Sequence, residues 1–148
     1  MDKTFPPRAL VGPGGTATER LRVATRERRQ VIDVTRQVDT VVRASGVKEG
    51  IALVHCPHTT AAVVVNERDP PLMMDLLEAA GQLVREGVWR HDPGEGNGAA
   101  HLRSMLLDRG GALPVEGGAL ALGTWQSVLL VELDGPRERE LWVQVVGH

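Results

Sequence analysis

Short runs of β-branched and other apolar residues alternate along this chain with polar clusters and turn-forming residues. Residues 63–65 are three consecutive valines, a pattern typical of a buried strand because β-branched side chains pack well on a pleated surface. Polar segments stand at both ends of this run, at residues 57–60 and 66–67. We therefore expect residues 61–66 to form a central strand that presents a functional site.

The same pattern predicts several other strands. Residues 21–25 and 30–33 are expected to form a hairpin, and residues 51–56 are expected to pair with 61–66. Later strands are expected at residues 112–115, 119–123, 127–133 and 140–146, with turns at 116–118 and 134–136.

Helical spacing predicts three helices. The first is capped by Asp33 or Thr35 and ends before Gly46. The second begins at residues 69–71, where an aspartate precedes two prolines, and is expected to end at Gly87. A third is expected at residues 99–108, ended by two glycines.

The expected buried positions are Val34, Val38, Val41 and Val42 in the first helix and Leu72, Leu76, Leu77, Leu83 and Val84 in the second. The element order predicts an α+β fold with a mostly antiparallel sheet or sandwich.

Composition narrows the class of protein. The 148 residues suit one domain, which we place at residues 18–148 after a flexible leader at 1–17 that is rich in proline and glycine. A net charge of −2 and few aromatic residues argue against nucleic-acid binding. No apolar run reaches the ~20 residues that span a bilayer. The single cysteine, Cys56, suits a reducing compartment, so we expect a cytoplasmic protein without a membrane partner.

Three histidines are candidate metal ligands. His58 stands at a strand break, and His91 and His101 flank a polar, glycine-rich loop. Three neutral imidazoles with an open fourth position form a zinc-type catalytic site, with Asp92, Asn97 and Glu67 as orienting groups. Each histidine also has a simpler explanation, as a turn residue bonded to backbone or as a solvated loop residue.

Charged residues suggest acid–base chemistry and anion binding. Glu132 interrupts an apolar strand, which is expected either of a residue leaning into water or of a general acid, general base or metal partner. Arg137 is a candidate either for its ion-pair partner or for an anion clamp. Arg90, Arg103 and Ser104 lie near the start of the third helix, where free amides attract phosphate.

Together these segments resemble the YjbQ-like family, often described as secondary thiamine-phosphate synthases. The likeness runs from about residue 19 to the C-terminus, and the leader and Pro93 depart from the family pattern. The resemblance implies an α+β homotrimer with sites near subunit interfaces and a metal ion held by His58, His91 and His101. The matching segments are residues 49–50, 57–61, 66–67, 90–92, 97, 100–104, 122–126 and 132–137.

The family activity joins hydroxymethylpyrimidine diphosphate to thiazole phosphate and releases pyrophosphate. By this resemblance, the site residues fall into catalytic and substrate-binding groups. The catalytic candidates are His58, Thr59, Glu67 and Glu132, and the candidates for binding a phosphorylated substrate are Arg90, Asn97, Arg103, Ser104, Thr124 and Gln126.

The metal is expected to be zinc-like at the histidines, although a diphosphate substrate would favour magnesium on oxygen ligands. Two alternatives stay open at this point. One is a metal-dependent hydrolase or lyase of a small phosphorylated metabolite, and the other is a non-enzymatic ligand-binding trimer.

Overall fold

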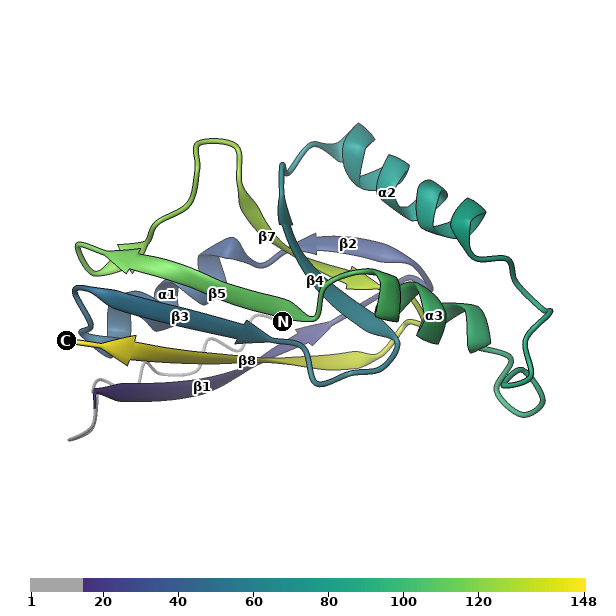
Figure 1. Cartoon of the computed structure of the whole chain (residues 1–148), viewed down its shortest axis with the longest axis horizontal. Helices are drawn as coiled ribbons and strands as arrows, with labels where there is room; N and C mark the ends of the chain where they lie inside the picture. Colours follow the sequence, from purple (N-terminus) through teal and green to yellow (C-terminus); the bar gives the residue numbers. More distant parts are fainter. Residues whose placement is uncertain (1–14) are drawn as a thin grey trace.

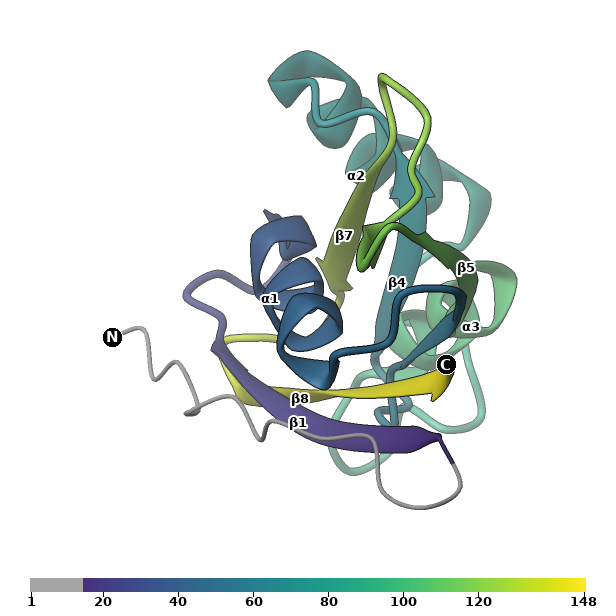
Figure 2. The ribbon, with the colours of Figure 1, turned by 90° about the vertical axis from the view of Figure 1, so that its left-hand side faces the viewer.

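The computed structural model describes residues 15–148, which form two antiparallel sheets curled into a half-barrel around one helix (Figures 1 and 2). The larger sheet has the strand order β1-β8-β3-β5-β6, and the smaller has the order β2-β7-β4. This confirms the predicted α+β, mostly antiparallel class. The elements are β1 Thr16–Ala24, β2 Gln30–Asp33, α1 Thr35–Ser45, β3 Gly50–His55, β4 Ala61–Asn66, α2 Pro70–Leu83, α3 Gly98–Leu106, β5 Gly110–Glu116, β6 Ala119–Leu120, β7 Ser127–Glu132 and β8 Glu138–Gly147.

Helix α1 fills the concave side of the half-barrel, where it contacts strands of both sheets (Figure 2). The predicted valines face this core, and Gly46 ends the helix in the left-handed region at φ 78°. The predicted cap is wrong in detail. Val34 is the N-cap residue, while Asp33 lies one residue further out and accepts hydrogen bonds from the Thr35 amide and hydroxyl.

Strand pairing differs from the expected hairpins. β1 pairs with β8 and β2 pairs with β7, so these two neighbours in sequence belong to different sheets. β3 and β4 are also separated, because the segment before β5 lies between them. The Arg109 carbonyl accepts the Cys56 amide at 2.8 Å, and the Asp108 carbonyl accepts the Val63 amide at 2.8 Å. Apolar alternation fixes which face of a strand is buried but does not choose its partner.

Helices α2 and α3 cover the outer face of the smaller sheet (Figure 2). There Leu76 and Leu77 pack against buried residues such as Val131. The predicted stripe of α2 is only partly buried, since Leu72 and Leu83 are 40% and 72% exposed. Because this helix lies on the outside of the sheet, only one narrow side of it meets the core.

Both outer helices end earlier than predicted. α2 ends at Leu83 rather than Gly87, and the Arg103 side chain accounts for this end by binding the carbonyls of Ala80, Gly81 and Val84. α3 ends at Leu106, and the glycines expected to terminate it instead begin β5.

A carboxylate just beyond α2 ties the outer layer to the rest of the molecule. Glu86 forms ion pairs with Arg28, Arg29 and Arg103, the last at 2.8 Å. Burial raises the pKa of Glu86, but the guanidinium groups of Arg103 and Arg29 outweigh that effect and lower it below its usual value. Glu86 therefore links the β1–β2 turn, the end of α2 and the buried face of α3.

Two features of the predicted organisation fall at the edges of the described chain. β1 begins at Thr16, so the strand starts inside the region expected to be leader, whose residues 1–14 lie outside the described range. No helix within residues 15–148 is both long and apolar enough to cross a lipid bilayer.

Gly110 should be irreplaceable where β5 leaves the gap between the sheets. It has φ +121°, and an added Cβ would lie 1.8 Å from the Val54 carbonyl oxygen. We expect Gly110→Ala to lower the free energy of unfolding by at least the roughly 1–3 kcal/mol of a strained backbone residue. Gly111→Ala is the matched control, because its added Cβ meets no atom within 4 Å. Urea unfolding of both variants measures the difference, and equal stabilities would contradict this explanation.

Candidate functional site

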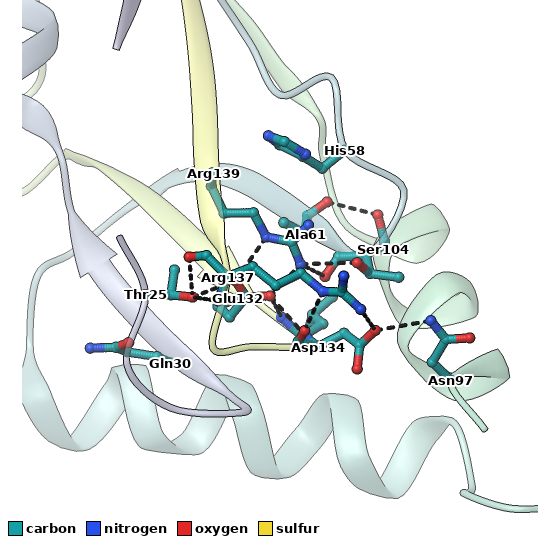
Figure 3. Close-up of polar contacts among 12 residues, drawn as sticks. Thr25, Gln30, His58, Ala61, Asn97, Ser104, Glu132, Asp134, Arg137 and Arg139 are labelled. Atoms are coloured by element: carbon teal, nitrogen blue, oxygen red, sulfur yellow. Dashed lines mark hydrogen bonds and ion pairs between the residues drawn. The ribbon is translucent and has the colours of Figure 1, made fainter. Parts of the chain in front are cut away.

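Glu132 lies at the end of β7, on the side of the smaller sheet where β4 begins, and it is fully buried. Its Oε2 accepts hydrogen bonds from the Thr25 hydroxyl and from Arg139 Nε, each at 2.8 Å. Its Oε1 accepts the amides of Leu133 and Asp134 and a further bond from Arg139 (Figure 3). Both carboxylate oxygens are therefore occupied by the protein itself.

The partner of Glu132 is Arg139 rather than the expected Arg137. Burial raises the pKa of Glu132, but the bonds from Arg139, the Asp134 amide and Thr25 outweigh it and hold the pKa below its usual value. Arg139 is 3% exposed. The sequence carried an indication of this pairing, because Arg139 occupies the same alternating face of β8 as the buried Leu141 and Val143.

Arg139 also positions the polar segment before β4. Its Nη2 donates to the Thr60 carbonyl at 3.1 Å and to the Thr60 hydroxyl at 2.9 Å. Thr60 is buried and was not among the predicted site residues, whereas the predicted Thr59 is exposed. The buried ion pair thus fixes the backbone on which His58 and Thr59 stand.

His58 is held at both its backbone and its ring. Arg109 donates to the His58 carbonyl at 2.9 Å, and the Glu140 amide donates to Nε2 at 2.8 Å. A ring nitrogen that accepts an N–H is unprotonated, so this bond places the proton of the neutral ring on Nδ1. Burial and then the charge of Arg139 lower the pKa of His58, which favours the neutral imidazole.

His91 and His101 lie side by side. Their ring centroids are 4.6 Å apart in an edge-on arrangement, with His101 in the first turn of α3 and His91 in the loop before it. Asp92 shapes this loop, because its carboxylate accepts the Trp89 amide at 2.9 Å and the Gly98 amide at 3.0 Å. The loop is therefore folded back onto the start of α3.

Asn97 joins the start of α3 to the turn between β7 and β8. It is 3% exposed, and its amide nitrogen donates to Asp134 at 2.9 Å (Figure 3). The same nitrogen donates to Glu95 at 3.2 Å. Asp134 also receives Arg137 at 2.9 Å. Burial raises the pKa of Asp134, and the bonds from Asn97 and Arg137 outweigh this effect and lower it. Through this contact Asp134 ties the Glu132 region to the histidine pair.

The structure gives several candidate residues other tasks. Arg103 is 2% exposed, and its guanidinium donates to backbone carbonyls at the end of α2 and to Glu86. The buried Ser104 hydroxyl donates to the Ala61 carbonyl. Arg90 remains exposed. Cys56 is buried, and that burial raises the pKa of its thiol, as expected of a structural cysteine.

The remaining candidates lie at the other end of β4. Glu67 follows β4, and Thr124 lies in the loop before β7, where both line a groove beside α1. Gln126 accepts the Gly123 amide at 2.9 Å in the same loop. A six-residue strand spans roughly 20 Å. These residues are therefore separated from the histidines by the length of β4.

Within residues 15–148, no three side chains of histidine, cysteine, aspartate or glutamate come together as a ready metal site. His91 and His101 are adjacent, but His58 points its Nε2 toward the Glu140 amide. Of the three imidazoles expected to share a metal, the structure brings two together within one chain.

Replacing Glu132 with glutamine should leave Arg139 buried without a counter-charge. We expect the free energy of unfolding at pH 7 to fall by about 3–5 kcal/mol, which denaturant titration measures. The exposed Glu116 provides the control substitution, Glu116→Gln, which should change little.

The same variant should also change how stability depends on pH. Because the folded pKa of Glu132 is depressed, its contribution is complete above the unfolded value of about 4.3 and is lost as pH falls through the folded pKa. The difference between wild type and Glu132→Gln should therefore shrink in acid. A gap that stayed constant below pH 4 would contradict an ionised Glu132.

Comparisons with known proteins place this arrangement in a family. A family model described as UPF0047 protein YjbQ-like matches residues 19–148. A UPF0047 protein of Archaeoglobus fulgidus is 42% identical over 127 residues, covering 85% of this chain and 98% of that protein. The UPF0047 protein YugU of Bacillus subtilis is 37% identical, covering 86% of this chain and 97% of that protein.

Solved structures give the same result. A YbjQ-like protein of unknown function from Sulfolobus solfataricus superposes with a TM-score of 0.87 at 38% identity, covering 90% of this chain and 98% of that one. A hypothetical protein of Aeropyrum pernix gives a TM-score of 0.86 at 42% identity, covering 89% and 99%. On both sequence and fold, the chain belongs to the YjbQ-like UPF0047 family.

Proposed function

We propose that this protein is a metal-dependent enzyme that acts on a small phosphorylated metabolite. The observation that carries the proposal is the contact between His91 and His101, whose ring centroids are 4.6 Å apart at the start of α3. Two imidazoles held against each other by a folded loop are a suitable nucleus for a transition-metal site.

His58 is the third ligand in this proposal. Its lowered pKa keeps the imidazole neutral, as metal binding requires. Its Nε2 must first leave the Glu140 amide, because coordination through Nδ1 would move the ring proton to Nε2 and break the same hydrogen bond. A bound metal ion would supply a Lewis acid for a phosphoryl or carbonyl oxygen.

The chain offers cationic groups for phosphate in the same region. Arg90 is exposed beside His91, and Arg137 is half-exposed while bound to Asp134. The first turn of α3 adds backbone amides that have no acceptor within the helix, although the Gly98 amide is already bound to Asp92. Arg103 and Ser104 are less suitable, because their polar atoms already serve the protein.

The family resemblance suggests the finer assignment, transfer of a hydroxymethylpyrimidine group to thiazole phosphate with release of pyrophosphate. A diphosphate substrate would bring magnesium on its own oxygens, separate from a zinc-like ion on the histidines. A metal-dependent hydrolase or lyase would use the same histidine site on another phosphorylated metabolite.

One observation favours a second candidate function, a non-enzymatic ligand-binding trimer. Glu132, the expected acid–base group, has both oxygens occupied by Arg139, Thr25 and backbone amides. A carboxylate engaged in this way is poorly placed to transfer protons to a substrate. A binding protein would need no such transfer.

We further propose that the chain acts as a cytoplasmic homotrimer. Exposed apolar side chains support assembly, among them Ile51 and Leu53 on β3 and Val146 on β8, which are 54%, 43% and 47% exposed. The free, buried Cys56 is compatible with a reducing compartment.

Metal content gives the first test of the enzyme proposal. We expect elemental mass spectrometry of untagged protein to find near one zinc, manganese or similar ion per chain, lost in His91→Ala and His101→Ala. His55→Ala is the matched control, since His55 packs against Trp142 within the larger sheet, away from the histidine pair. Absence of metal in wild type, even after reconstitution, would refute the histidine site.

Turnover of the two thiamine precursors then tests the reaction. His58→Ala and His101→Ala should lose most product formation, while His55→Ala keeps it. Full activity in the first two variants would refute their assignment. Specific binding of a ligand without chemical change would instead support the non-enzymatic trimer.

Light scattering coupled to size exclusion should give three times the 16.0 kDa mass of one chain. Adding charge at the exposed apolar face, as in Leu53→Glu, should dissociate the assembly because a buried unpaired carboxylate is costly. Met74→Glu on α2 is the control, because Met74 is also an exposed apolar residue but lies on the helix over the smaller sheet, away from this face. A monomer in wild type would contradict the assembly.

A further inference from the structure

A groove of about 980 Å³ runs beside α1, between β1 on one side and the loop before β7 on the other. No histidine lines it, so it is distinct from the His91–His101 pair. Its volume is in the range of small-molecule sites. It contains Glu67 and Thr124, two residues that the histidine site leaves unused.

Part of the charge in this groove is already committed to the fold. Asp39 accepts the Leu120 amide at 2.9 Å and pairs with Arg43, while Asp33 accepts Thr35 and lies 3.4 Å from Arg68. These two aspartates hold the helix and the neighbouring loop in place, and they leave little capacity for a ligand.

The remaining charged groups are of both signs. The positive groups that line the groove are Arg22 and Arg36, and the negative groups are Glu19 and Glu67. None of these four side chains forms an ion pair within residues 15–148. Arg36, Arg22 and Glu67 are exposed, so a ligand can reach them. An equal number of free guanidinium and carboxylate groups suits a molecule that carries both charges.

The start of α1 indicates where the negative end of such a molecule would bind. The helix has no acidic residue in its first turn and no side-chain hydrogen bond from its cap, Val34, whereas Arg36 stands in that turn. A cation at a helix N-terminus opposes the helix dipole. Asp33 offsets part of this cost, because its carboxylate accepts the Thr35 amide, and a bound carboxylate would offset the rest through Arg36 and the amides that follow.

The groove also has an apolar side. Leu21, Val41 and Leu122 line it, and Trp125 lies on its rim with 73% of its surface exposed. An exposed indole offers a large apolar face to a ligand, because burying it is strongly favourable. An apolar or aromatic body attached to the charged groups would pack here.

We propose that this groove binds a small zwitterion with an apolar or aromatic body, for which an α-amino acid such as phenylalanine is the simplest model. The site is independent of the proposed metal chemistry. Loss of one should leave the other intact, which the metal content of the groove variants reports directly.

Isothermal titration calorimetry with three probes tests the two-charge requirement. L-Phenylalanine carries both charges, 3-phenylpropanoate lacks the ammonium group, and phenethylamine lacks the carboxylate. We expect phenylalanine to bind about tenfold more tightly than either analogue, since each charged hydrogen bond contributes at least that factor. Equal binding of all three, or no saturable binding of any probe at millimolar concentration, would overturn the proposal.

Two variants assign the ends of the ligand. Arg36→Gln should weaken phenylalanine and 3-phenylpropanoate about tenfold and leave phenethylamine unchanged, and Glu67→Gln should do the reverse for the two analogues. Arg85→Gln and Glu116→Gln are matched controls, being exposed residues outside the groove. Unchanged affinities in both groove variants would refute the assignment, whatever the metal content of the protein.

Discussion

The buried pair of Glu132 and Arg139 is the interaction on which the rest of this structure depends. Its two members come from the end of β7 and the start of β8, and its hydrogen bonds reach Thr25 after β1 and Thr60 before β4. Four chain segments therefore meet at one ion pair inside an apolar environment. Such a pair is costly to bury, and it is retained here with every carboxylate lone pair directed at a donor.

This ion pair also explains why functional groups gather nearby. His58 and Thr59 stand on the backbone that Arg139 holds, and Asp134 follows Glu132 directly and carries the link to Asn97 and α3. A rigid support of this kind places loop residues accurately, which a binding or catalytic site requires. The groove beside α1 relies on different anchors, the carboxylates of Asp33 and Asp39.

The sequence predicted element types better than their partners, and particular residues show why. The valines of α1 all face a core, so helical spacing identified them; α2 meets the core along one narrow side, and its exposed Leu83 could not be distinguished from a buried one. The alternation of apolar residues does not determine which strands pair with each other. The sequence indicated that His91 and His101 could meet, because they flank a polar loop next to a helix. It could not show that Glu67 and Thr124 lie far from these histidines, because that separation depends on the direction of β4. Arg139 could have been identified, because it lies on the same face of β8 as the buried Leu141 and Val143.

The ion pairs of Glu86 with Arg28, Arg29 and Arg103 make the stability of the outer layer depend on salt concentration. Glu86 is 42% exposed, and it secures the end of a helix whose apolar contacts with the sheet are few. Dissolved ions screen exposed charges within about 8 Å at physiological ionic strength and more strongly in concentrated salt. The inner core has no comparable dependence, because the Glu132 pair is sealed from solvent. Added salt should therefore weaken the attachment of α2 and of the adjoining loop, which carries His91, without changing the half-barrel.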